Sequence, residues 1–361
     1  MIDSEGINRV IRLQMTAVNL GLNGLLFLDM TNIRYLVGFT GSDGALIIGE
    51  DAAVLLVDGR YTTQAKQETL NIEIIEYQDK IDAISSTLLR GEWQKVGIES
   101  KVITLHDYLK LRDKLSDLEL IPLADELCAI RSVKDWTEIN RIKKAAGISS
   151  DALTSTLSRI RAGVAEKDIA LELEFQIRNR GAENISFEII VASGANSAMP
   201  HARPGDRRLE PGDFVVFDYG AVYEGYCSDE TSTIVLGNIS DRQREVYEIV
   251  KEAHDSAINS IKAGIPCNEI DRKARNIIEK KGLGQYFSHG TGHGVGLSVH
   301  ENPRISTPST SHLEAGMVIT IEPGVYFPGL WGIRIEDMVL VKDNGCEILT
   351  TFSKELKVVS L

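Results

Sequence analysis

Residues 209–223 read LEPGDFVVFDYGAVY, and the same pattern returns as LEAGMVITIEPGVYF at residues 313–327. Each copy is a β-branched and aromatic run that ends in an acid, which predicts a buried strand with a carboxylate at its end. An unpaired carboxylate in a protein interior costs several kcal/mol. Asp218 and Glu322 occupy matching positions in the two copies, so each of them needs a partner that neutralises its charge.

The repeat extends to both sides of these strands. The matching flanking segments are 162–181 with 263–282, and 225–237 with 332–341. The first pair has helical spacing and a terminal glycine typical of a helix C-terminus. The second pair sets Asp229 against Glu336. The sequence therefore predicts two fused copies of a helix-then-hairpin unit, each with two carboxylates on adjacent strands.

The first part of the chain has a different organisation, in which short strands alternate with helices. The expected strands are 23–29, 44–50 and 52–59, and the expected helices are 62–70 and 106–118. We expect an α/β domain over residues 1–130 and a second domain over residues 131–361. The second domain should begin with an amphipathic helix that Ser132 caps, with Trp136, Ile139 and Ile142 on one face.

Composition narrows the class of protein. The chain has 361 residues, enough for two domains, and a net charge of −13 without a Lys- or Arg-rich run, so we expect no nucleic-acid partner. No apolar run reaches membrane-spanning length, and the first residues lack a signal-peptide core. The four cysteines lie far apart without a CxxC pair. These features predict a cytoplasmic protein with reduced thiols and no membrane association.

Carboxylates brought together repel one another, so one would be driven to protonate unless cations intervene. Four acids with one histidine make a ligand set for two divalent ions that share carboxylates. The glycine-rich segment 288–303 supplies His289, His293 and His300, and His201 comes from the other copy. This segment matches neither GxGxxG nor a Walker loop. The alternative is four unrelated hairpin acids that face solvent, and their matching register in both copies speaks against it.

The motifs FDYG, CSDETST, HGTGHGVGLSVHE, TIEPGVY and IRIEDMVLV together resemble the pita-bread metallopeptidases, namely aminopeptidase P and prolidase. NIRYLVGFTGSDG (32–44) and VDGRYTTQA (57–65) resemble the creatinase-type N-terminal domain of the same enzymes. The resemblance spans nearly the whole chain. It implies an α+β protein, in which a creatinase-type α/β domain precedes a pita-bread catalytic domain with an internal pseudo-two-fold repeat.

The same resemblance implies a ligand set for two divalent metal ions per subunit. Asp218 would bind one ion, His293 and Glu322 would bind the other, and Asp229 and Glu336 would bridge both. Manganese is the expected metal, with cobalt or zinc as alternatives that the ligands do not exclude. A water activated between the ions would be the nucleophile. The ions would also neutralise Asp218.

Other roles follow from the resemblance rather than from spacing. Glu322 would carry a proton to the leaving imino nitrogen, and His201 and His300 would line the substrate site and stabilise the tetrahedral intermediate. Arg304 would grip the carboxylate of a dipeptide; the alternative is an arginine on a loop surface. Arg334 would hold a ligand carboxylate without binding metal.

Two further features belong to the pattern. His289 matches the family pattern and would, like Arg334, support the site without binding metal; the alternative is a structural role. The family's common SDxTRT reads SDETST here, with Glu230 and Ser232 in place of an apolar residue and an arginine. The charge beside Asp229 therefore differs from the family pattern, which bears on metal affinity.

The function implied is metal-dependent hydrolysis of the bond between an N-terminal residue and proline. The substrate is a small peptide with proline in second position, and the motifs do not separate aminopeptidase P from Xaa-Pro dipeptidase. A creatinase-like amidinohydrolase and a metal-free binding module are the alternatives; both are disfavoured because all five ligands are present. A homodimer is the family expectation.

Overall fold

The computed structural model describes residues 4–124, 127 and 129–360. The chain divides into two compact units, Met1–Cys128 and Ala129–Leu361. Within the described ranges, none of the helices combines the length and the apolar character that crossing a bilayer requires.

The first unit is built on a six-stranded mixed sheet in the order β4-β3-β2-β1-β5-β6. Its strands are β1 (Gly24–Phe27), β2 (Ala45–Gly49), β3 (Ala53–Asp58), β4 (Glu73–Tyr77), β5 (Lys95–Glu99) and β6 (Glu119–Leu123). Its helices are α1 (Ser4–Asn19), α2 (Met30–Val37), α3 (Thr62–Glu68), α4 (Lys80–Arg90) and α5 (Leu105–Lys114). The three strands and two helices expected from the sequence are confirmed.

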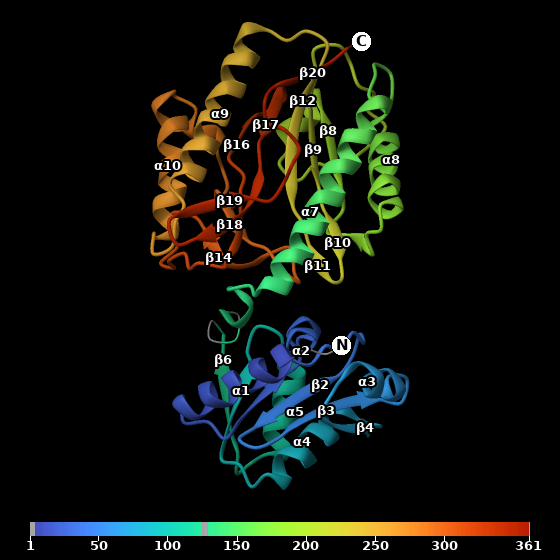
Figure 1. Ribbon diagram of the computed structural model, residues 1–361, viewed down its shortest axis with the longest axis vertical. Helices are drawn as coiled ribbons and strands as arrows, with labels where there is room; N and C mark the ends of the chain where they lie inside the picture. Colours follow the sequence, from blue (N-terminus) through green and yellow to red (C-terminus); the bar gives the residue numbers. More distant parts are fainter. Residues whose placement is uncertain (1–3, 125–126, 128, 361) are drawn as a thin grey trace. The chain divides into compact units, whose positions relative to one another are not determined.

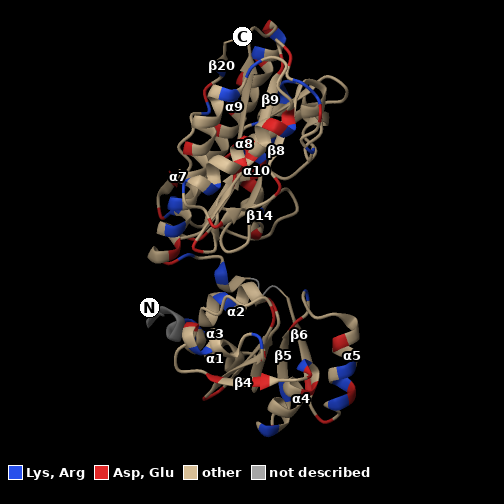
Figure 2. Ribbon diagram, turned by 90° about the vertical axis from the view of Figure 1, so that its right-hand side faces the viewer, with Lys and Arg blue, Asp and Glu red and all other residues tan. Residues whose placement is uncertain are grey.

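The central strands of this sheet are buried because they are apolar on both faces. Every residue of β1 and β2 is buried, and Leu26, Ile47, Leu56 and Val96 form one core with Ile84 of α4. On the outside, α5 carries both basic and acidic residues (Figure 2).

The second unit places its strands between two pairs of helices. Figure 1 shows α7 (Trp136–Thr156) and α8 (Glu166–Asn179) on one side, and α9 (Asp241–Asn259) and α10 (Cys267–Lys280) on the other. The expected cap of α7 was wrong. Asp135, not Ser132, is the N-cap and forms a capping box with Glu138. Trp136 is 71% exposed, so it does not share the buried face of Ile139 and Ile142.

The strands of the second unit form two larger sheets, β20-β12-β9-β8 and β14-β13-β15-β18-β19, and two smaller ones. Strands of the first copy and its flanks are β7 (Asn184–Ile185), β8 (Ile190–Ser193), β9 (Phe214–Tyr219), β10 (Ala221–Tyr223), β11 (Tyr226–Cys227) and β12 (Glu230–Leu236). The remaining strands are β13 (Gly292–Gly294), β14 (Glu301–Ile305), β15 (Val318–Ile321), β16 (Gly324–Phe327), β17 (Trp331–Arg334), β18 (Asp337–Lys342), β19 (Gly345–Ile348) and β20 (Lys357–Val359).

The internal repeat is confirmed. Helix α8 corresponds to α10, and the antiparallel pair β9–β12 corresponds to β15–β18. Glycines at matching positions adopt the same left-handed backbone: Gly163 and Gly264 have φ of 85° and 83°, and Gly212 and Gly316 have φ of 91° and 92°. Only glycine adopts these angles without strain, which explains why both copies carry it there.

A candidate metal centre between the two copies

Each copy of the repeat places one acid at the end of its first strand and another just before the partner strand. Asp218 lies near the end of β9, and Asp229 immediately precedes β12. Glu322 follows β15, and Glu336 immediately precedes β18. His293 occupies the middle of the short strand β13, which pairs with β15. The duplicated hairpin thus delivers two acids from each copy.

Three of the five expected ligands form a compact group. Donor atoms of Asp229, His293 and Glu336 all lie within 4.8 Å of one another. His293 Nε2 is 3.6 Å from Asp229 Oδ2 and also 3.6 Å from Glu322 Oε1. The other ring nitrogen, Nδ1, lies 3.0 Å from the carbonyl oxygen of Gly294. If Nδ1 donates there, Nε2 keeps a lone pair that faces the carboxylates, as a metal-binding histidine requires.

The protonation properties of this group show that its charges are not balanced within the chain. Burial, with the charge of Asp218 next, raises the pKa of Asp229 well above its ordinary value. Burial and the charge of Asp229 do the same to the pKa of Glu336, and burial raises the pKa of Glu322 to about 7. Burial also lowers the pKa of His293 to about 4. Crowded acids beside a neutral imidazole are the environment that a divalent cation stabilises.

Asp218 is the acid with a cation of its own. Its Oδ2 lies 2.5 Å from Nη2 of Arg334. Its Oδ1 is buried and has no hydrogen-bond partner among the described residues. The expectation that metal ions alone neutralise Asp218 is therefore incomplete, because a guanidinium takes one oxygen. The orphaned oxygen fits a metal ligand, since a buried acceptor without a partner is costly.

Arg334 connects the two copies through the remaining donors of its guanidinium. Nη1 donates to the hydroxyl of Tyr326 at 2.9 Å and to the carbonyl of Pro200 at 3.1 Å. Nε donates to Thr231 Oγ1 at 3.0 Å, and that hydroxyl donates to Glu336 Oε2 at 2.7 Å. One side chain of β17 therefore orients acids from both copies.

His289 belongs to this network and lies outside the compact ligand group. Its Nδ1 is 2.7 Å from the carbonyl oxygen of Gly290, and its Nε2 is 3.0 Å from the hydroxyl of Tyr326. Burial lowers its pKa to about 4, so it is neutral at physiological pH. Sequence reasoning missed Tyr326 and Thr231, because neither repeats between the copies and neither is a typical metal ligand.

The residues expected to contact substrate are exposed. The ring of His300 packs edge-on against that of His293, with centroids 4.4 Å apart. Arg304 of β14 is paired directly opposite His293 of β13, so their side chains share one face of the sheet. Burial lowers the pKa of His300, and the positive charge of Arg304 adds to that effect. His201 is exposed on the segment that follows β8.

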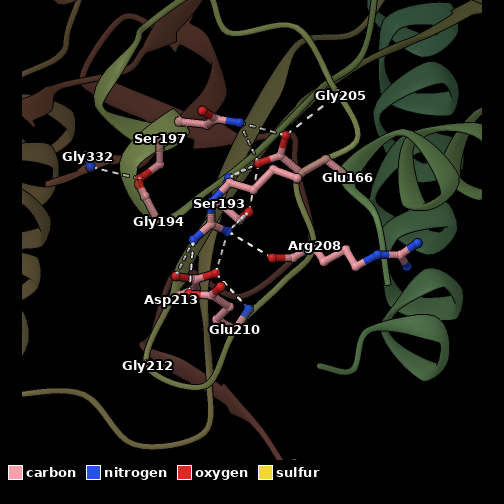
Figure 3. Close-up of polar contacts among 12 residues, drawn as sticks. Glu166, Ser193, Gly194, Ser197, Gly205, Arg208, Glu210, Gly212, Asp213 and Gly332 are labelled. Carbon is pink, nitrogen blue, oxygen red and sulfur yellow. Dashed lines mark hydrogen bonds and ion pairs between the residues drawn. The ribbon is translucent and has the colours of Figure 1, made fainter. Parts of the chain in front are cut away.

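A buried glutamate holds the segment that carries His201. Figure 3 shows the carboxylate of Glu166, from the start of α8, directed at the chain after β8. It accepts hydrogen bonds from the backbone N and the hydroxyl of Ser193, both at 2.7 Å, and from the side chain of Asn196. It also accepts from the backbone N of Gly205 at 3.4 Å. Both ends of the segment are thereby fixed, which limits where His201 can lie.

Known proteins share both units of this chain. Residues 140–343 match the model of metallopeptidase family M24, and residues 9–133 match the creatinase/prolidase N-terminal domain. An Xaa-Pro dipeptidase of Pyrococcus horikoshii is 39% identical over 338 residues, which cover 93% of this chain and 94% of that protein.

Two solved structures show the same agreement. An Xaa-Pro dipeptidase from Bacillus anthracis superposes with a TM-score of 0.94 at 40% identity, covering 98% of this chain and 99% of that one. An X-Pro aminopeptidase from Thermotoga maritima gives a TM-score of 0.91 at 40% identity, covering 97% and 99%. With the family model matching more than half of its residues, the chain belongs to metallopeptidase family M24.

Proposed function

We propose that this protein is a metal-dependent Xaa-Pro dipeptidase, which hydrolyses the bond between an N-terminal residue and a following proline. The observation that carries the proposal is the compact group of Asp229, His293 and Glu336, whose donor atoms lie within 4.8 Å of one another. Glu322 adjoins it through His293. The similarity to proteins named Xaa-Pro dipeptidases supports the substrate class.

The five donors fit two divalent ions. Asp218 and Glu322 would each serve one ion, His293 would join Glu322, and Asp229 and Glu336 would be shared. Four carboxylates with one imidazole suit manganese, with cobalt or zinc as alternatives. When bound, the ions would lower the pKa of a water molecule and polarise the scissile carbonyl.

The chain's own residues divide the remaining work. Glu322, at the edge of the ligand group, would pass a proton to the nitrogen of the leaving proline, a transfer typically worth about 10²–10⁴-fold in rate. His300 and His201, both exposed, would contact substrate and donate hydrogen bonds to the oxygen that becomes negative in the tetrahedral intermediate. Arg334 would keep Asp218 oriented through its contact at 2.5 Å.

Arg304 supports the choice of a dipeptidase over an aminopeptidase. Its exposed side chain lies on the same sheet face as His293, which it opposes across β13 and β14. A dipeptide presents its free carboxylate close to the scissile bond, and a guanidinium binds a carboxylate through two charge-assisted hydrogen bonds. A longer peptide has an amide at that place and gains little from the positive charge.

The test compares two substrates with Mn²⁺ present. For Arg304→Ala, we expect kcat/KM on an Xaa-Pro dipeptide to fall roughly 10- to 150-fold, because hydrogen bonds to charged groups contribute about 1.5–3 kcal/mol. Hydrolysis of an Xaa-Pro-Yaa tripeptide should change far less. Arg304→Lys serves as the control that keeps the charge and loses the fork geometry, and it should give an intermediate loss.

Equal losses on both substrates would mean that Arg304 does not select for dipeptides. A wild-type preference for the tripeptide would favour an X-Pro aminopeptidase, the second candidate that the Thermotoga maritima structure represents. If neither peptide is hydrolysed when Mn²⁺ is present, the proposal is overturned.

The thiols of Cys267 and Cys346, which form no disulfide, are consistent with the cytoplasmic location that we also propose. The expected homodimer is to be tested by light scattering.

A further inference from the structure

A second set of acids lies directly behind the metal-binding carboxylates. Glu230 follows Asp229 in the chain, and Asp337 follows Glu336. Thr231 pairs with Asp218 and donates a hydrogen bond to Glu336, so its strand neighbour Glu230 points away from the ligand group. Asp337 contacts the same lysine as Glu230, and these two acids are here called the rear acids. Both are buried: the side chain of Glu230 is 0% exposed and that of Asp337 is 6% exposed.

One lysine joins the rear acids of the two copies. Nζ of Lys354 lies 2.6 Å from Glu230 Oε1 and 3.7 Å from Asp337 Oδ1. It also donates to the hydroxyl of Ser232 at 3.1 Å. The side chain of Lys354 is 5% exposed, so water screens these interactions little.

The segment that carries this lysine is held by both copies. Lys354 lies between β19 and β20, and β20 pairs in parallel with β12 of the first copy. The backbone N of Thr351 donates to Ser150 of α7 at 3.1 Å, and Tyr247 of α9 donates to the carbonyl of Lys354 at 3.0 Å. The hydroxyl of Thr350 donates to Asp337. The ammonium is therefore fixed in place rather than carried on a mobile arm.

We propose that Lys354 is a positioning residue for the metal centre. By binding both rear acids, Lys354 fixes the distance between the first residues of β12 and β18, which directly follow Asp229 and Glu336. Those two carboxylates are the ones that would be shared between the ions, so their separation sets how well a pair of ions is held. This inference rests on the two-metal site of the proposed function.

The lysine also contacts both altered positions of the motif. The pattern that the chain resembles has an arginine where Ser232 stands, and Lys354 contacts Ser232 and Glu230 from another segment of the chain. A positive charge therefore lies beside position 232 in this chain as well. A guanidinium at position 232 should reach the same carboxylates, which provides a rescue experiment.

The experiment measures binding of Mn²⁺ by titration and the electron paramagnetic resonance signal of a spin-coupled Mn²⁺ pair. In Lys354→Met, we expect the dissociation constant of the weaker ion to rise about 10- to 100-fold, the range found when residues behind metal ligands are changed, and the coupled signal to weaken. Adding Ser232→Arg to that variant should restore both. Lys143→Met is the control, because Lys143 forms an ion pair with Glu347 and does not contact the rear acids.

The double variant Lys354→Met/Glu230→Gln guards against a folding defect, since it removes the acid together with its cation. It should still bind the weaker ion 10- to 100-fold less tightly. Wild-type binding and a wild-type coupled signal in this variant would show that Lys354 only neutralises Glu230, and would overturn the inference. A wild-type protein that binds no pair of ions would instead overturn the proposed function, and the inference with it.

Discussion

Glu336 and Asp337 are neighbours in the chain and both are buried, yet their acidities move in opposite directions. Burial and Asp229 raise the pKa of Glu336 well above its ordinary value. Burial also opposes ionisation of Asp337, but Lys354 and His254 together hold its pKa below the ordinary value. The difference shows that the chain supplies Asp337 with cations of its own, whereas Glu336 lies among other acids. Burial still raises the pKa of the other rear acid, Glu230, although Lys354 opposes that effect.

The metal-binding carboxylates of Asp218, Asp229, Glu322 and Glu336, here called the front acids, are not wholly without positive charge, because Arg334 contacts one oxygen of Asp218. That guanidinium is itself committed to Thr231, Tyr326 and the carbonyl of Pro200. Arg334 therefore orients the front acids more than it neutralises them. Front and rear acids can be compared experimentally, because metal ions would neutralise the front acids and Lys354 pairs with the rear acids.

The largest effect is expected from Glu322→Gln, which removes an anionic front ligand and the proposed proton carrier together. We expect kcat on an Xaa-Pro dipeptide to fall by about 10²–10⁴-fold while the thermal unfolding midpoint of the metal-loaded protein changes little. Glu314→Gln, an exposed acid on the approach to the same strand, is the control. A loss below tenfold with metal retained would point to another proton carrier.

A second effect separates the roles of Arg334 and the metal. Replacing Arg334 by Met leaves the side chain of Asp218, which is only 16% exposed, without its partner. Breaking a buried ion pair costs about 3–5 kcal/mol of stability. Bound ions would compensate part of the unpaired charge on Asp218. Urea unfolding should therefore show a larger loss in chelator-treated protein than in protein saturated with Mn²⁺. The same loss in both forms would mean that no ion reaches Asp218.

The smallest effect is the pH dependence of stability between pH 6.5 and 8. Acids whose pKa is raised by folding, such as Glu322 at about 7, bind more protons when folded. The free energy of unfolding of the metal-free protein should then fall as pH rises, by up to about 1.4 kcal/mol per pH unit for each acid still protonated.

Bound metal should abolish that trend, because ions hold these carboxylates ionised in the folded protein and the same acids are ionised in the unfolded chain at this pH. The raised pKa of His254 also makes stability fall as pH rises, but His254 is present with or without metal. The difference between metal-loaded and metal-free unfolding curves therefore isolates the front acids. A difference that is constant from pH 6.5 to 8 would contradict their assignment as ligands.

The repeat was predictable because strand-terminal acids and left-handed glycines recur at matching positions. Asp218 with Glu322, and Asp229 with Glu336, carried that signal in the sequence alone. The cap of α7 was also within reach. Both Ser132 and Asp135 are good capping residues, but only Asp135 is followed three residues later by the glutamate of a capping box.

The partners of the acids were not predictable from pattern. Lys354 meets Glu230 across 124 residues of chain, and no periodicity in the sequence near the C-terminus distinguishes this lysine. Tyr326 likewise has no counterpart in the first copy, where Val222 stands. Sequence periodicity reports which face a residue lies on, whereas these contacts depend on how separate elements pack.

The most direct test of the central claim is the manganese content of purified protein, measured by mass spectrometry for the wild type and for Asp229→Asn. We expect two bound ions per wild-type chain and fewer in the variant, because Asp229 would be shared between both ions and the asparagine that replaces it carries no charge. Full metal content with normal turnover in Asp229→Asn, or a wild-type protein that binds no divalent ion, would contradict it.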